Sequence, residues 1–202
     1  SLDEKDEALD YYQQGLSLFQ EVDDKVGEAT VLNNIASIYL SRGEMQDALE
    51  DFNQVLPIFR EVGNRAMEAT VLSNIGRVFY GRGKMEDALE YYKQALFLLR
   101  LSGDKMKEAT MLNEIGLVHH ALGNMNEARD HFLESVEIFH EIGDIWSEVT
   151  VRTSVVALYI ELDELDRAIE SLETTIPLAA EAAHPNLSKF QALLIVLNEQ
   201  RE

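Results

Sequence analysis

The sequence contains no cysteine, which excludes disulfide bonds, cysteine-ligated metals and thiol chemistry. An absence of cysteine is typical of cytoplasmic proteins, and we expect this chain to be cytoplasmic. No apolar run approaches the roughly 20 residues that a membrane-spanning helix needs. The first ten residues carry neither a basic nor an apolar segment, so no signal peptide is expected there.

Basic residues are also scarce. The chain has 17 Lys and Arg against 37 Asp and Glu, for a net charge of −20. A field of that sign repels a phosphate backbone, which argues against nucleic-acid binding. The charge is compatible with a basic protein partner. The plainer interpretation is an acidic, solvated surface that keeps a repetitive protein from aggregating.

What the sequence does contain is a long internal repeat. Alanine recurs every 40 residues at Ala48, Ala88, Ala128 and Ala168, and the pattern of residues 68–100 recurs 40 residues earlier and later. Within this pattern, apolar residues at helical intervals flank a glycine, which predicts a helix, a tight turn and a second helix. We call these helix A and helix B. Each repeat of such an array contacts only its neighbours.

The period divides the chain into a half-repeat, four full repeats and a final helix. The predicted limits are 1–28 for a helix B without its helix A, 29–68, 69–108, 109–148 and 149–188 for the repeats, and 189–202 for a capping helix. The fourth repeat departs from the others, because Asp163 replaces the turn glycine, Arg152 a leucine and Val156 a small residue. Terminal repeats are often atypical since one face meets water, so we interpret these changes as capping.

Local signals predict where the helices begin, end and approach one another. The residues expected to cap the A helices, each followed by a glutamate in the first turn, are Asp24, Asn64, Asp104 and Asp144. The glycines expected to close the A helices in the left-handed conformation are Gly43, Gly83 and Gly123. The small residues expected to lie close against helix B are Ala36, Gly76 and Gly116.

Two prolines stand inside predicted B helices, at Pro57 and Pro177. Proline removes one backbone hydrogen bond and usually bends a helix. We therefore predict a bend in both helices, with the first continuing to about Val62.

The second repeat resembles the tetratricopeptide repeat. The residues at that family's signature spacings are Leu72, Ile75, Gly76, Phe79, Gly83, Ala88 and Tyr92. Each unit is about six residues longer than the usual ~34, and this long variety is similar to kinesin light chains, spindle-orientation adaptors and prokaryotic regulators. HEAT and armadillo arrays also have periods near 40, but a turn glycine placed between an aromatic residue and an alanine favours the tetratricopeptide family. The resemblance implies an all-α right-handed α-α superhelix of about nine to ten antiparallel helices.

In this family helix A lines the inner, concave surface, which implies a peptide-binding groove. The residues that the resemblance points to are Thr30, Asn33, Asn34, Thr70, Asn74, Arg77, Tyr80, Asn113 and His120. In related adaptors an asparagine at the place of Asn34 and Asn74 holds a peptide main chain, because a carboxamide both donates and accepts. The alternative is that both are polar residues on a solvated helix face.

Arg77 is the one cation near the centre of this predicted groove. It suits a bidentate pair with a partner carboxylate, but we favour a pair with a neighbouring acid of the chain. The family also includes a carboxylate clamp for chaperone tails, built from cations and asparagines on helix A. Only Asn74 of that set is present here and the cations are missing, so chaperone-tail binding is not expected.

No metal, cofactor or catalytic site is expected. Four histidines gather in the third repeat, but His119 takes a core position and convergent carboxylates at metal-ligand spacing are missing. The sequence also has no phosphate-cradling glycine loop and no nucleophile elbow.

The sequence thus predicts a non-catalytic scaffold that binds a peptide or helix of a partner protein in a concave groove. One alternative is the sensor or regulatory module of a larger prokaryotic signalling or transcription-regulating protein. A third possibility is weak self-association through apolar surface at the ends of the array.

Overall fold

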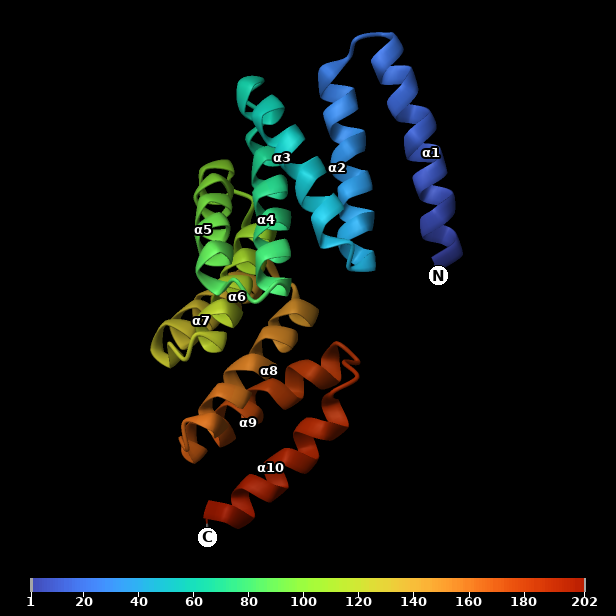
Figure 1. Cartoon of the computed structure of the whole chain (residues 1–202). Coiled ribbons are helices and arrows are strands. Elements are labelled where there is room, and N and C mark those ends of the chain that lie inside the picture. The colour runs from blue at the N-terminus through green and yellow to red at the C-terminus, as the bar shows by residue number, and fades with distance from the viewer. Residues whose placement is uncertain (1, 202) are drawn as a thin grey trace. The chain divides into compact units, whose positions relative to one another are not determined.

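The computed structural model describes residues 2–201, with side chains from Lys5 onward (Figure 1). Ser1 and Glu202, the outermost residues of the predicted 1–28 and 189–202 segments, lie outside the described residues. Residues 2–201 form ten helices and no strand, which confirms the all-α prediction and the expected number of helices. None of these helices has the length and hydropathy needed to cross a membrane.

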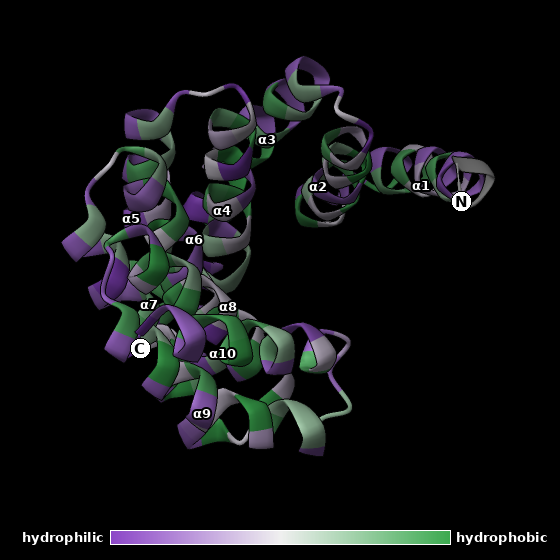
Figure 2. Cartoon of the chain, turned by 90° about the horizontal axis from the view of Figure 1, so that it is seen from below, coloured by the Kyte–Doolittle hydropathy of each residue, from purple (hydrophilic) through white to green (hydrophobic). Residues whose placement is uncertain are grey.

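The chain is made of two compact units, residues 1–102 and 103–202. The helices of the 1–102 unit are α1 (Leu2–Glu21), α2 (Lys25–Arg42), α3 (Met45–Glu61), α4 (Arg65–Gly81) and α5 (Met85–Ser102). Those of the 103–202 unit are α6 (Lys105–Ala121), α7 (Met125–Ile142), α8 (Ile145–Glu161), α9 (Leu165–Glu181) and α10 (Leu187–Arg201). Within each unit every helix packs against the next one along the chain. Figure 2 shows hydrophobic and hydrophilic residues alternating around the helices, as amphipathic helices require.

The helices follow the predicted order. The A helices of the four repeats are α2, α4, α6 and α8, and the B helices are α3, α5, α7 and α9. The lone helix B of the half-repeat is α1, and the final helix is α10. The proposed repeat limits each fall inside the beginning of an A helix, and as limits they stay a prediction.

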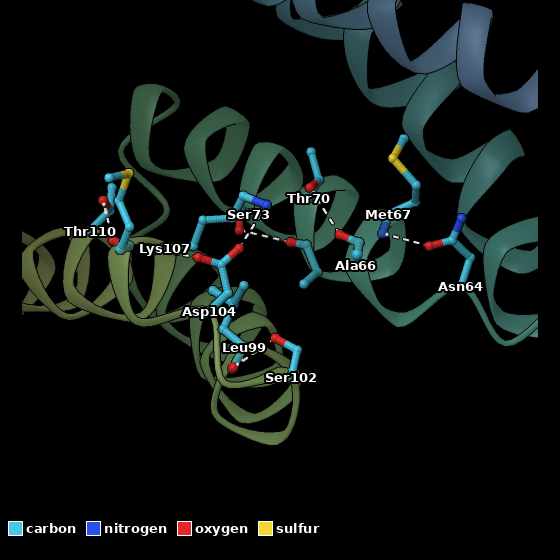
Figure 3. A network of polar contacts seen from close by, with 12 residues as sticks. Asn64, Ala66, Met67, Thr70, Ser73, Leu99, Ser102, Asp104, Lys107 and Thr110 are labelled. Carbon is cyan, nitrogen blue, oxygen red and sulfur yellow. Dashed lines mark hydrogen bonds and ion pairs between the residues drawn. The ribbon is translucent and has the colours of Figure 1, made fainter. Parts of the chain in front are cut away.

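Side-chain caps begin all four A helices, as predicted. Asp24 accepts from the backbone N–H groups of Val26 and Gly27 at 3.1 and 2.9 Å. The other three caps each accept one N–H three residues on, and they are Asn64, Asp104 and Asp144. Figure 3 shows the caps at Asn64 and Asp104. Lys107, which also bonds to the Asp104 carboxylate, lowers the pKa of that carboxyl below its ordinary value. These caps satisfy N–H groups that a helix start leaves without partners.

Left-handed residues end the A helices. Gly43, Gly83 and Gly123 have φ between +72° and +79°, as predicted. A second glycine series, which was not predicted, ends B helices in the same way at Gly63, Gly103 and Gly143. In the fourth repeat Asp163 takes the left-handed conformation itself, with φ +59°. Asp tolerates this region because its short side chain bonds locally.

Ala183, after α9, is also left-handed, with φ +50°. An alanine there suffers a contact between its Cβ and its own backbone that glycine avoids. We expect Ala183→Gly to raise the free energy of unfolding by about 0.5–1 kcal/mol in urea titrations. The neighbouring Ala182 has φ −76°, so Ala182→Gly should instead lower stability by about 0.5 kcal/mol. Equal changes in the free energy of unfolding for Ala183→Gly and Ala182→Gly would contradict the proposed backbone strain at Ala183.

The prolines do not interrupt their helices. Helix α3 runs through Pro57 to Glu61, with Val62 as its C-cap, which agrees with the predicted end. Helix α9 likewise runs through Pro177 to Glu181. The bend at each proline stays a prediction.

Close packing between helices A and B explains the small residues of helix A. A Cβ placed on Gly76 would lie 2.5 Å from the ring of Tyr92, and one on Gly116 would lie 2.6 Å from the ring of Phe132. Both rings are fully buried in the following B helix. The predicted need for small side chains is therefore confirmed at Gly76 and Gly116, because protein interiors leave no free volume for an added methyl group.

Candidate functional site

The A helices carry the predicted peptide-binding residues, and in the 1–102 unit a hydrogen bond joins two of these helices. Asn74 of α4 donates from Nδ2 to the Ser37 hydroxyl of α2 at 3.4 Å. The polar faces of α2 and α4 therefore adjoin each other. The other predicted residues of this unit lie on the same two helices, namely Thr30, Asn33 and Asn34 on α2 and Thr70, Arg77 and Tyr80 on α4.

The threonines at the start of the A helices already use their hydroxyl protons. Thr30 donates to the Val26 carbonyl at 2.7 Å, and Thr70 donates to the Ala66 carbonyl at 3.0 Å (Figure 3). Thr110 in α6 makes the equivalent bond. Each threonine can therefore offer a ligand its methyl group and an acceptor lone pair, rather than a free donor.

Asn33 lies deeper than predicted. Only 4% of it is exposed, and its Oδ1 has no hydrogen-bond partner among the described residues. The Oδ1 of Asn113, at the equivalent place in α6, is likewise buried and without a partner. Buried polar atoms of this kind are rare in native structures and each costs free energy.

The same position is satisfied in the other two repeats. Ser73 in α4 donates to the Ala69 carbonyl at 2.8 Å, and Thr153 in α8 donates to the Val149 carbonyl at 3.1 Å. The helical packing alone thus does not require an unpaired acceptor at this place. Of the four residues at this position, only Asn33 and Asn113 have a buried acceptor without a partner among the described residues.

In the 103–202 unit Asn113, whose Oδ1 is buried without a partner, is one of the residues that line a cavity of about 230 Å³. The remaining walls come from α6, α7 and α8, and they are Thr110, Phe139, Trp146, Ser147, Thr150 and Val151. Trp146 is the sole tryptophan of the chain and is 51% exposed. Its ring lies against that of His184, with centroids 4.6 Å apart. The cavity thus combines an amide side chain, an aromatic surface and apolar side chains, as ligand pockets in proteins do.

A second cavity, of about 370 Å³, lies in the 1–102 unit between α1 and α2. Asn34 and Ser37 line it from α2, while Lys5, Ala8 and Tyr12 line it from α1. Asn34 is half-buried, and its side chain is one of those that line this cavity. Its expected peptide-binding role stays a prediction.

Three further predicted residues differ in their surroundings. Arg77 is exposed and makes no ion pair with the described side chains of residues 5–201, so the favoured pair with a neighbouring acid is not found. Tyr80 is half-buried. His120 is bound to Glu161, with Nε2 and Oε2 2.6 Å apart, so this ring is already engaged.

His119 is a core residue, as predicted. It is 8% exposed and stacks on His131 with ring centroids 5.4 Å apart. Residues 2–201 include no group of three His, Asp or Glu side chains arranged to hold a metal ion.

Sequence reasoning missed the burial of Asn33 and of the Asn113 Oδ1, and it did not single out Trp146, which lines the cavity. Asn33 and Asn34 are adjacent and identical in type, so the sequence offers no signal for which side chain turns inward. Trp146 stands at a helix start in the one repeat that has a tryptophan, and that departure from the repeat could have identified it.

Comparison with known proteins agrees with the geometry. A family model described as tetratricopeptide repeat matches residues 2–61, 27–100 and 107–181, and a second model of the same description matches residues 73–139. No curated protein sequence matches the chain.

Among solved structures, BtubC (BKLC) from P. vanneervenii is similar at 16% identity and a TM-score of 0.80, over 96% of this chain and 83% of that one. A Rap protein complexed with Competence and Sporulation Factor is 22% identical with a TM-score of 0.76, over 90% of this chain and 51% of that one. A signal transduction ATPase (STAND) protein with a tetratricopeptide repeat sensor, from Pyrococcus horikoshii, is 17% identical with a TM-score of 0.70, over 96% and 33%. At these identities the likeness concerns the fold.

Proposed function

Because this chain belongs to the tetratricopeptide repeat family, we propose that it is a non-catalytic scaffold that holds a peptide or helix of a partner protein against its A helices. The observation that carries the proposal is a cavity of about 230 Å³ lined by Asn113 and Trp146, where the buried Oδ1 of Asn113 has no partner among the described residues. A peptide N–H that entered this cavity would supply the missing hydrogen bond. Burial of an acceptor without a partner raises the free energy of the unbound protein, and a peptide that supplies the partner would recover this free energy on binding.

The same logic applies in the 1–102 unit. Asn33 has a second unpaired acceptor, and Asn34 and Ser37 line the cavity of about 370 Å³. Amides and hydroxyls spaced along helices A suit an extended peptide, whose backbone repeats its donors and acceptors at regular intervals. The net charge of −20 favours a partner segment with basic residues.

Peptide selection followed by site-directed replacement tests the proposal. A displayed random-peptide library would be selected on the wild-type chain, and binding of the selected peptides followed by the fluorescence of Trp146, the sole tryptophan. We expect Asn113→Ala to weaken binding roughly five- to tenfold while leaving the free energy of unfolding unchanged or higher. If Asn113 were only structural, its replacement would lower the free energy of unfolding and leave peptide binding unchanged.

The matched control is Asn126→Ala, which removes an exposed asparagine from the same unit and should leave binding unchanged. Selection of no saturable binder, or equal binding by wild type and Asn113→Ala, would overturn the proposed site.

A second candidate function is the sensor or regulatory module of a larger prokaryotic protein. The comparison of chain lengths supports this candidate. The chain covers only 51% of the Rap protein and 33% of the STAND protein, whose tetratricopeptide repeats are named a sensor. The sequence of the complete gene tests this candidate. An adjoining signalling or DNA-binding domain would support it, and an open reading frame limited to the repeats would exclude it.

A further inference from the structure

A larger cavity, of about 560 Å³, lies in the 103–202 unit among α7, α8 and α9. Three arginines line it, one from each helix: Arg129, Arg152 and Arg167. The whole chain has only 17 Lys and Arg against 37 acids. Three guanidinium groups around a single cavity are therefore a local concentration of basic side chains in an acidic protein.

Comparison of the repeats indicates that the helical packing does not require arginine at positions 129 and 167, whereas Arg152 also pairs with the buried Glu148. The residues 40 and 80 before Arg129 are leucines, and leucines also precede Arg152 at the same intervals. The residues 40, 80 and 120 before Arg167 are all acidic. Three positions that are leucine, leucine and acid in the earlier repeats thus all become arginine here. The structure brings the three changes to one place.

Each guanidinium group forms an ion pair with an acid of the chain, and these ion pairs occupy only some of its N–H donors. Arg152 donates from Nε and Nη2 to Glu148 at 2.9 and 2.8 Å, and Arg167 donates from Nη1 to Glu164 at 2.8 Å. Arg129 approaches Asp130 only to 3.7 Å. Each guanidinium has five N–H groups, so all three side chains keep donors that a ligand can use.

The rest of the wall limits the class of ligand. Leu133, Val136 and Val155 give the cavity an apolar side, and the ring of Tyr159 lies 5.9 Å from the Arg167 guanidinium carbon. Glu170 adds one negative charge to the wall. A singly charged carboxylate suits this mixture better than a doubly charged phosphate, because the planar guanidinium matches a carboxylate bidentately and Glu170 repels added charge.

We propose that this arginine cavity binds a partner segment in which a carboxylate stands next to an apolar side chain. The carboxylate lies among Arg129, Arg152 and Arg167, and the apolar side chain lies against Val136 and Val155. The cavity shares no lining residue with the one at Asn113. The two sites can therefore succeed or fail separately.

The test follows the side-chain Nε–Hε resonances of the arginines in the full chain by NMR. The probes are N-acetyl-Leu-Leu with a free C-terminal carboxylate, the same dipeptide as its amide, N-acetyl-Leu-Glu-amide, and N-acetyl-Leu-phosphoserine-amide. We expect saturable shifts at the three arginines with the carboxylate probes and binding at least about tenfold weaker for the neutral amide, since a charge-assisted hydrogen bond accounts for that ratio.

Two variants restore residues of the earlier repeats and should therefore fold: Arg129→Leu and Arg167→Asp. Each should weaken binding of the carboxylate probes about tenfold. Arg65→Ala removes an exposed arginine from the other unit and should leave binding unchanged.

Three outcomes would overturn the inference. They are an absence of saturable shifts with every anionic probe, equal binding of carboxylate and amide, and unchanged binding by both restored variants. Tighter binding of the phosphoserine probe than of the glutamate probe would overturn the carboxylate assignment and identify a phosphate site instead.

Discussion

Replacement of Arg152 by alanine is expected to lower the free energy of unfolding by about 3 kcal/mol, because it leaves a buried carboxylate without its main partner. Glu148 is 1% exposed and accepts a hydrogen bond from Arg152 Nε, with Arg152 Nη2 2.8 Å away, while its other partner, His140, is largely exposed. The A helices of the first three repeats have a glutamate at the same place, paired with Lys25, Arg60 or Lys105. The fourth repeat has no lysine or arginine at those positions, and Arg152 replaces them.

Urea unfolding of the full chain measures the effect. The double variant Glu148→Gln/Arg152→Ala should recover part of the loss, because a neutral amide is less costly to bury alone than a carboxylate. Lys189→Ala removes an exposed cation from the same unit and should change stability by less than about 0.5 kcal/mol. If Arg152→Ala cost no more than this control, the pair would not stabilise the unit.

Replacement of Ala88 by phenylalanine is expected to destabilise the 1–102 unit by about 3 kcal/mol. Ala88 is fully buried in α5, and its carbonyl oxygen lies 3.3 Å from the place that a Cβ on Gly76 would occupy. Helices α4 and α5 therefore already touch through their backbones. A ring at position 88 would have to separate them or displace the buried Tyr92.

Thermal and urea unfolding of the full chain test this expectation. Ala66→Phe adds the same ring at an exposed position of α4 and serves as the matched control, with an expected change below about 0.5 kcal/mol. A loss of less than about 1 kcal/mol for Ala88→Phe would mean that the contact relaxes without cost and that the alanine series has another cause.

The local features of this fold could be predicted because each depends on residues close together in the chain. An N-cap such as Asp24 acts on N–H groups two and three residues away, and the glycine at Gly43 ends a helix through its own φ. The helical period similarly identifies buried faces, which is why the core position of His119 was predicted. The family, the number of helices and the need for small residues at Gly76 and Gly116 followed from these signals.

The candidate sites could be predicted only in part, because side chains from different helices form them. The A-helix face was predicted from the family resemblance and stays a prediction, and on that face Asn33 rather than Asn34 carries the buried unpaired acceptor. Adjacent positions on a helix point about 100° apart, so a small rotation of the helix decides which side chain turns inward. Arg77 was expected to have an acidic neighbour, and none of the described acids lies within ion-pair distance.

By itself the sequence determined the repeat, its helices, their ends and the family, since periodicity and capping act over a few residues. The tertiary structure alone decided which polar atoms remain without partners and which arginines share a cavity. Arg129, Arg152 and Arg167 are separated by 23 and 15 residues in the chain, and no local rule brings them together. Their convergence depends on the distances at which α7, α8 and α9 pack, and those distances are set by the side chains of all three helices at once.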